Sequence, residues 1–360
     1  MTEAKQHFKD FLTNIRLSKN QINDLATGHK TLRNRLSDDE ELSKIVQTTF
    51  LQGSYKRNTA IKPKNGKRSD VDIIVVTNIN PDEVTPQEAM DLFVPFLDKH
   101  YEGKWEFNSR SIGISLSYVD LDLVLTAEIN DITDLNYMKS EEKNAQNSLE
   151  KILKQDNLFF LNSSNDLLFK DNKSEDPDPI LIPDRENEIW EETNPLAQIN
   201  WTIDKNRDCN THYINVVKAL KWWKRLNPSP KYPKGYPIEH FIGVTCPDNI
   251  NSVAEGVVKI LEEIVTNYED KPFLNDHGVP AHDVFERISD DDYAEFYDLV
   301  ENAAEQARKA FDEPDNSTSI SYWRELFGNE FPSPTVPPKQ NNNFTERKSL
   351  TKDIGSARFG

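Results

Sequence analysis

Apolar residues recur at helical spacing through the first fifty residues. One set runs from Phe8 to Ile15 at three- and four-residue intervals, and a second runs from Ile22 to Leu36. This spacing places apolar side chains along one side of a helix. We therefore predict helices through residues 5–50.

The pattern then changes to short apolar runs that are typical of strands. Val71–Val76 is continuous, and further runs occupy residues 104–107, 111–118 and 119–125. Residues 86–101 lie between them and return to helical spacing. The order helix, strand, helix, strands predicts a mixed α/β fold.

The second half of the chain divides into three parts. Residues 139–200 are polar and irregular, and we expect an insertion or a connection between two lobes. Helical patterns follow at Tyr213–Arg225, Ser252–Tyr268, Asp283–Ile288, Asp291–Phe311 and Ser319–Phe327. The predicted organisation is a core with N-terminal helices and the insertion (1–200), a helical lobe (201–331) and a disordered tail (332–360).

Charge narrows the possible partners. The formal net charge is −18 and the pI is about 4.9, which argues against stable binding of long nucleic acid but not of single nucleotides. Basic residues nevertheless gather in one loop, which is either a solvated surface or a local phosphate-binding surface: Lys56, Arg57, Lys62, Lys64, Lys67 and Arg68.

Two cysteines, Cys209 and Cys246, lie far apart in the sequence, and we expect free thiols. This number excludes a cysteine-rich zinc site of the usual spacing. The N-terminus has no apolar secretory segment, and no run approaches the roughly 20 apolar residues of a membrane span. We expect a cytoplasmic protein that does not enter membranes.

The candidate chemistry lies around the first strand. Asp70 and Asp72 open the Val71–Val76 run, and alternate strand residues point to the same face. Two carboxylates on one face can bind a hard cation such as Mg²⁺. Gly53-Ser54, just upstream, can offer backbone N–H groups and a hydroxyl to phosphate. Together these features predict phosphoryl or nucleotidyl transfer.

A two-metal site requires a third carboxylate, and the run at residues 119–125 carries Asp120 and Asp122. We favour Asp122, because the apolar residues after it resemble those after Asp72. Asp120 either supports the site or faces solvent. An Asp-x-Asp pair alone is more often a solvated strand end, and the combination with Gly-Ser argues for the site. The G-x-x-x-x-G-K-[ST] phosphate-binding motif is absent, which disfavours P-loop enzymes.

The combined pattern resembles the polymerase-β-like nucleotidyltransferases in Gly53-Ser54, Asp70-Val71-Asp72 and Asp122. The helical N-terminal segment and helical second half resemble, more narrowly, the cGAS/DncV-like nucleotidyltransferases (CD-NTases) of bacterial CBASS anti-phage systems. Segments similar to the clade D enzymes (CdnD) are Arg68–Asn78, Met90–Leu97, Ser111–Thr126, His212–Trp223 and Lys231–Gly243.

This resemblance implies an α/β (α+β) fold, with a polymerase-β-like core and a helical, oligoadenylate-synthetase-like second lobe. It implies condensation of ATP and GTP into a cyclic di- or trinucleotide messenger, with cyclic AMP-AMP-GMP expected by analogy with clade D. Two Mg²⁺ ions, with Mn²⁺ as an alternative, would be held by Asp70, Asp72 and Asp122.

The resemblance also assigns residues to the nucleotide. Those implied are Gln52, Gly53, Ser54, Lys218, Lys221, Lys234 and Tyr236. A glycine, Gly235, stands where cGAS-like relatives carry a serine before the tyrosine, so a serine–phosphate bond is not expected. We expect Trp222 and Trp223 to lie in the core.

In many CBASS operons a ubiquitin-transfer-like ligase joins the synthase C-terminus to a target, and a protease reverses the step. The resemblance therefore implies conjugation at Gly360. Two other functions remain open. One is a nucleotidyltransferase that modifies tRNA or protein, and the other is a catalytically silent nucleotide-binding module.

Overall fold

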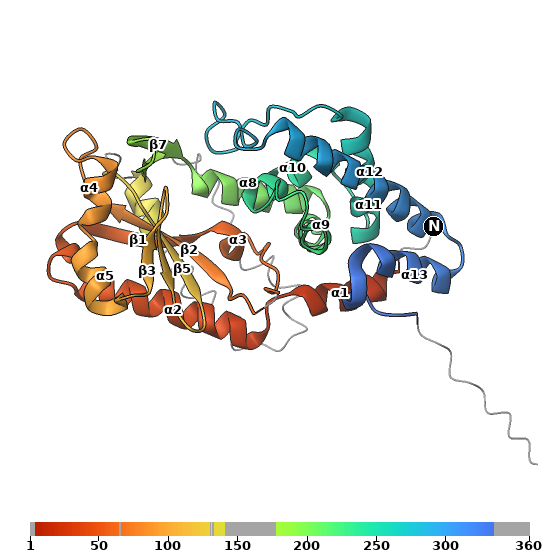
Figure 1. The fold of residues 1–360 in the computed structure, drawn as a ribbon, viewed down its shortest axis with the longest axis horizontal. Coiled ribbons are helices and arrows are strands. Elements are labelled where there is room, and N and C mark those ends of the chain that lie inside the picture. The colour runs from red at the N-terminus through yellow and green to blue at the C-terminus, as the bar shows by residue number, and fades with distance from the viewer. Residues whose placement is uncertain (1–3, 65, 130, 132, 141–177, 335–360) are drawn as a thin grey trace, which may run out of the picture.

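The structure is a computed structural model that describes residues 4–64, 66–129, 131, 133–140 and 178–334. Most of the predicted insertion and of the predicted tail lies outside these residues, as does Gly360. Figure 1 shows a sheet-containing core on the left and a helical lobe on the right. No helix in the described ranges combines the length and apolar character needed to cross a membrane.

The core is built on a five-stranded sheet. Its spatial order is β1 (Val46–Gln52), β2 (Asp70–Thr77), β5 (Asp120–Leu125), β4 (Ile112–Ser115) and β3 (Trp105–Phe107). Strands β2 and β5 run parallel, and the other neighbours are antiparallel. The mixed α/β prediction is confirmed.

The prediction of helix through residue 50 is wrong at its end, because β1 begins at Val46. This segment is rich in β-branched and aromatic residues, which fit a pleated surface. It pairs with β2 along its length, and the residues from Thr48 to Leu51 are buried. Pairing and burial in the sheet therefore outweigh the helical pattern that precedes it.

One face of the sheet is covered by helices α2 (Lys19–Asp38), α4 (Pro86–Asp91) and α5 (Val94–Tyr101). Ser18 begins α2 with a capping box. The single helix predicted for residues 86–101 is interrupted. Pro95 lies in the first turn of α5 and has no N–H to continue the hydrogen bonding of α4.

The other face of the sheet carries a smaller core in which Ile74, Val76 and Val124 meet β6 (Ile180–Asp184) and α8 (Pro195–Asp208). Strand β6 forms a hairpin with β7, Ile189–Thr193. The prediction that residues up to 200 are irregular is therefore wrong over this described end. The apolar run in β6 was too short to be recognised as a strand without its partner.

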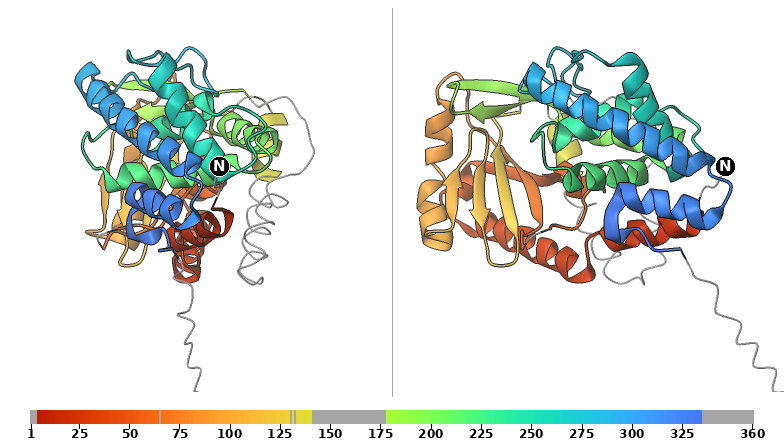
Figure 2. Two further views of the ribbon diagram at one scale, coloured as in Figure 1. Left: turned by 90° about the vertical axis from the view of Figure 1, so that its right-hand side faces the viewer. Right: turned by 45° about the vertical axis from the view of Figure 1, so that its right-hand side comes forward.

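The helical lobe consists mainly of α9 (Tyr213–Leu226), α10 (Tyr236–Thr245), α11 (Val253–Asn267), α12 (Asp290–Asp312) and α13 (Asn316–Phe327). Helix α11 packs against α9, and α12 packs against α11 (Figure 2). The predicted helices near α9, α11, α12 and α13 are confirmed.

The helix predicted at Asp283–Ile288 is not formed, and turns occupy the segment. The Asp283 carboxylate accepts hydrogen bonds from the backbone N–H groups of Leu274 and Phe285, both at 2.9 Å. Side chains that bond nearby backbone in this way compete with helical hydrogen bonding.

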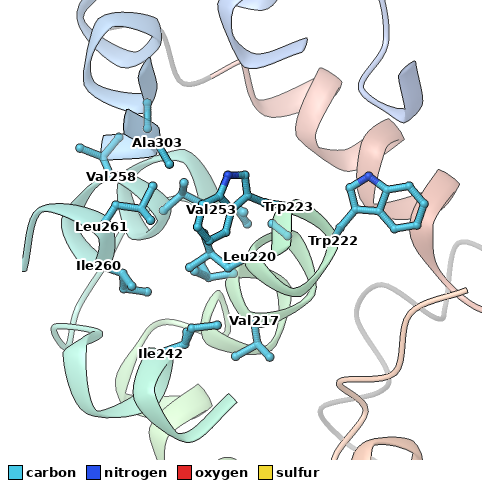
Figure 3. Close-up of a cluster of buried hydrophobic side chains, with 14 of the residues drawn as sticks. Val217, Leu220, Trp222, Trp223, Ile242, Val253, Val258, Ile260, Leu261 and Ala303 are labelled. Atoms are coloured by element: carbon cyan, nitrogen blue, oxygen red, sulfur yellow. The ribbon is translucent and has the colours of Figure 1, made fainter. Parts of the chain in front are cut away.

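Helix α1 (Lys5–Ile15) packs on the helical lobe and not on the sheet. The rings of Phe8 and Trp323 lie edge to face with centroids 5.0 Å apart. The boundary predicted at residue 200 stays a prediction, but this packing places the first helix with the second lobe. In Figure 3, Trp223 points into the core between α9 and α11, whereas Trp222 points towards α1. Both are buried, as predicted.

Candidate active site

The strand register brings the predicted carboxylates together on the sheet. In the parallel β2–β5 pair, Asp72 lies opposite Asp122 and Asp70 lies opposite Asp120. All four share the face of Ile74, because strand side chains alternate. That face is the one that turns towards β6 and α8. Adjacent strands lie about 4.8 Å apart, so neighbouring carboxylates can reach a common cation.

Gly53 is packed against Asp72. It begins α3 (Gly53–Lys56) with a φ of +71°, a conformation that side chains rarely adopt. A Cβ at this position would lie 1.8 Å from Asp72 Oδ2. Glycine is therefore required both for the backbone turn and to let the carboxylate lie against the start of α3.

The carboxylates repel one another. Burial, together with the charges of Asp70 and Asp122, raises the pKa of Asp72 to about 7. Burial also raises the pKa of Asp122, against hydrogen bonds from Ser111 and Asn108 that lower it. This donor set suits a divalent cation, which would offset the repulsion.

As they stand, the side chains do not form a complete metal cage. Among the described residues, no group of three or more His, Cys, Asp or Glu side chains is arranged to hold a metal ion. Asp122 Oδ1 is engaged instead by Ser111 Oγ and Asn108 Nδ2, each at 3.1 Å. Asp120 is held by Arg68, whose Nη2 lies 2.8 Å from Asp120 Oδ1.

A basic pocket of about 370 Å³ adjoins Asp70. Its size lies in the range of small-ligand sites. Ser54 and Lys221 line it together with Asp70, as expected for a triphosphate site. Its other cationic lining residues are Lys64, Lys67, Arg68 and Arg225. Three of these four belong to the basic loop, so the loop is not merely a solvated surface.

The two predicted lysines of α9 differ in position. Lys221 lines the pocket, and its Nζ lies 3.1 Å from the Thr59 carbonyl oxygen. Lys218 is buried beneath it and donates to Asn58 Oδ1 at 3.1 Å. Burial lowers the pKa of Lys218 well below its usual value.

Lys234 and Tyr236 lie outside the described lining of this pocket. Lys234 is exposed, with its Nζ 5.1 Å from the centre of the Tyr232 ring. Tyr236 opens α10, and the Arg57 guanidinium lies 5.1 Å from its ring centre. Arg57 follows α3, the Gly-Ser helix that begins with Gly53 and Ser54, so Tyr236 lies near this helix. The predicted stacking of Tyr236 on a base stays a prediction.

Two residues that lie near the pocket were not identified from the sequence. Arg225 lies one helical turn after Lys221 on α9, and this four-residue spacing was the available sign. Glu239 on α10 gave no such sign. Burial would raise the pKa of the Glu239 carboxyl, but Lys221 and Arg57 lower it to about 2.

Comparison with known proteins identifies the family. The Second Messenger Oligonucleotide or Dinucleotide Synthetase domain matches residues 1–152. A protein of Enterobacter hormaechei named cyclic AMP-AMP-GMP synthase is 44% identical over 379 residues, covering 99% of this chain and 100% of that protein. A Salmonella paratyphi B protein named probable cyclic AMP-AMP-GMP nucleotide synthase is 46% identical, covering 92% and 93%.

The solved structure of CdnC from E. coli MS115-1, in the CdnC:HORMA-deltaN complex, has a TM-score of 0.64. It is 16% identical, with 91% of this chain and 98% of that chain covered, and shows the fold. The fold is a polymerase-β-like nucleotidyltransferase core with a helical lobe.

The chain belongs to the CD-NTase family, and it is a nucleotidyltransferase of the class that makes cyclic oligonucleotides. The clade D resemblance stays a prediction.

Proposed function

We propose that this enzyme condenses ATP and GTP into cyclic AMP-AMP-GMP, a second messenger in anti-phage signalling. This product is proposed because the Enterobacter hormaechei protein named cyclic AMP-AMP-GMP synthase is 44% identical and covers 99% of this chain. Fold alone does not fix the choice of bases, so the assignment rests on this relative.

Asp70, Asp72 and Asp122 would hold two Mg²⁺ ions, with Mn²⁺ as a substitute. When bound, such ions activate the attacking ribose hydroxyl and stabilise the leaving pyrophosphate. The register of β2 and β5 supports this role for the chain's carboxylates. To bind a metal ion, Asp122 Oδ1 would exchange its hydrogen bonds to Ser111 and Asn108.

The triphosphate would lie in the basic pocket beside Asp70. Ser54 donates its hydroxyl there, and Lys221 and Arg225 supply positive charge. Gln52 and Gly53 shape the start of α3, and Lys218 supports α9 from beneath. Lys234 and Tyr236 would contact the nucleoside part of the donor, where an aromatic ring can stack on a base.

The test is direct. Purified protein is incubated with Mg²⁺ and each labelled nucleoside triphosphate, alone and in combination, and the products are treated with phosphatase and analysed by mass spectrometry. A phosphatase-resistant ring of two adenylates and one guanylate supports the proposal. A ring of other composition contradicts the product, and label on added tRNA or protein favours the other transferase function.

Matched substitutions test the site. Asp70→Asn and Asp72→Asn should each abolish synthesis. Asp82→Asn, in an exposed turn of the same core, should leave synthesis unchanged. Undiminished synthesis by either of the first two variants would contradict the two-metal assignment, and loss in all three variants would show a general effect on folding.

The resemblance also leads us to propose a partner for Gly360, which lies outside the described residues. A ubiquitin-transfer-like ligase would join the Gly360 carboxylate to a target, and a protease would release it. Deletion of Gly360 should abolish conjugates when the chain is expressed with the ligase of its operon. Conjugates that persist after the deletion would refute this proposal.

A further inference from the structure

Glu239 connects the two lobes below the basic pocket. It lies on α10 in the helical lobe and is only 4% exposed. Its Oε2 accepts hydrogen bonds from Thr59 Oγ1 at 2.7 Å and from Arg57 Nε at 3.3 Å, both in the sheet-containing core. Its Oε1 lies 2.5 Å from Lys221 Nζ on α9. One buried carboxylate therefore contacts both lobes.

The core partners of Glu239 hold the Gly-Ser helix in place. The Thr59 backbone N–H donates to the Ser54 carbonyl at 2.9 Å, and that of Arg57 donates to the Gly53 carbonyl at 3.0 Å. Any shift of Glu239 relative to this loop would therefore be transmitted to the residues that begin α3. Ser54, in turn, lines the pocket.

On the other side, Glu239 restricts Lys221. An ammonium group has three donors, and here two are directed to Glu239 Oε1 and the Thr59 carbonyl oxygen. Lys221 also lines the pocket, so the third donor remains for a bound anion. A long, flexible lysine side chain is thereby fixed before any ligand arrives, which removes the entropic cost of ordering it later.

The charge balance explains why the group at residue 239 is a carboxylate. Arg57 is 6% exposed and Lys218 is 3% exposed, and both lie in the surroundings of Glu239 with Lys221. A neutral residue would remove the carboxylate that pairs with the buried Arg57 and with Lys221. It would also leave the ammonium of Lys221 less restricted, because one of its two hydrogen-bond partners would lose its charge.

We propose that Glu239 is a positioning residue that sets Lys221 and the Gly-Ser helix at a fixed separation around the donor triphosphate. This inference rests on the proposed nucleotidyl transfer and adds a residue to it. Its effect is on alignment and not on attraction. Misplacement of a reacting group by about 1 Å can cost about 100-fold in rate.

The test is a double-mutant cycle between Glu239→Gln and Lys221→Met, in which kcat and KM for ATP are measured. We expect Glu239→Gln to lower kcat by about 10- to 100-fold and to change KM by less than about threefold. In the Lys221→Met background the same substitution should change kcat by less than about threefold, because the separation between the Lys221 ammonium and the Gly-Ser helix no longer exists. Glu262→Gln is the matched control, since it breaks a 2.6 Å pair with Arg308 on the outer helices and should leave both constants unchanged.

An equal loss of kcat in both backgrounds would overturn the inference, as would a rise in KM with unchanged kcat. Thermal unfolding identifies any variant that is unfolded at the assay temperature. If Glu239→Gln is unfolded, Thr59→Val is used in its place, because it removes the 2.7 Å donor to Glu239 and otherwise only a 3.4 Å contact with the Ser54 carbonyl oxygen. It should lower kcat by about threefold or more with Lys221 present and have no effect without it. An equal effect in both backgrounds again overturns the inference. A wild-type enzyme with a different product refutes only the proposed product, because the cycle can be measured on whatever product forms.

Discussion

Substitution of Gly53 by alanine tests whether the close approach of α3 to Asp72 makes the site. The φ of +71° alone costs an alanine about 1 kcal/mol. The new Cβ would also lie 1.8 Å from Asp72 Oδ2 and 2.7 Å from its Cγ, so the carboxylate must move. Such overpacking costs a further 1–3 kcal/mol, roughly. We expect a total loss of about 2–4 kcal/mol in the free energy of unfolding.

The matched control is Gly103→Ala, which introduces the same side chain at φ +68° with nothing within 4 Å. It should lose about 1 kcal/mol and keep full activity. Gly53→Ala should also lose at least about 100-fold in kcat, because Asp72 is displaced. Both variants are compared by chemical denaturation and by rates of product formation. If Gly53→Ala and Gly103→Ala lost equal stability and Gly53→Ala kept activity within about threefold of wild type, the role of Gly53 in making room for Asp72 would be refuted.

Two further predictions concern charge at the site. Because the folded-state pKa of Asp72 is raised to about 7, its contribution to stability is lost as pH rises from about 4 to 7. Asp72→Asn should therefore stabilise the metal-free protein by about 1–4 kcal/mol at pH 8, while abolishing synthesis. Unfolding in EDTA should show this gain shrinking at pH 5, and a loss of stability at pH 8 would contradict it. Arg225→Gln should raise KM for ATP by about 10-fold by removing a pocket cation. Arg207→Gln, on the exposed side of α8, should leave KM unchanged, and equal KM values for the two variants would exclude Arg225 from the site.

The carboxylates could be predicted from the sequence because their geometry is local. Asp70 and Asp72 share a face in any strand. The apolar residues after Asp72 and Asp122 favour burial of the opposite face of the sheet. Lys221 could be placed only through the family resemblance. The fold of its helix was nevertheless predictable from the apolar spacing along Tyr213–Arg225.

The missed features depend on contacts between distant parts of the chain. Val46–Gln52 becomes a strand through pairing with β2, and its own pattern continues that of the preceding helices. Glu239 looks like an isolated acid within an apolar helix. Its core partners Arg57 and Thr59 lie about 180 residues earlier, so no local spacing connects them.

The parallel register of β2 and β5 also bears on how the enzyme can fail. Were β5 to pair with β2 one residue out of step, Asp122 would exchange places with leucine side chains and enter the apolar layer beneath α2. Such a chain would lose the activity outright, because the Asp122 carboxylate and the leucine side chains would each face the wrong side of the sheet. Correct pairing of these two strands therefore decides whether the carboxylates meet at all, and a shift of one residue leaves no partial site.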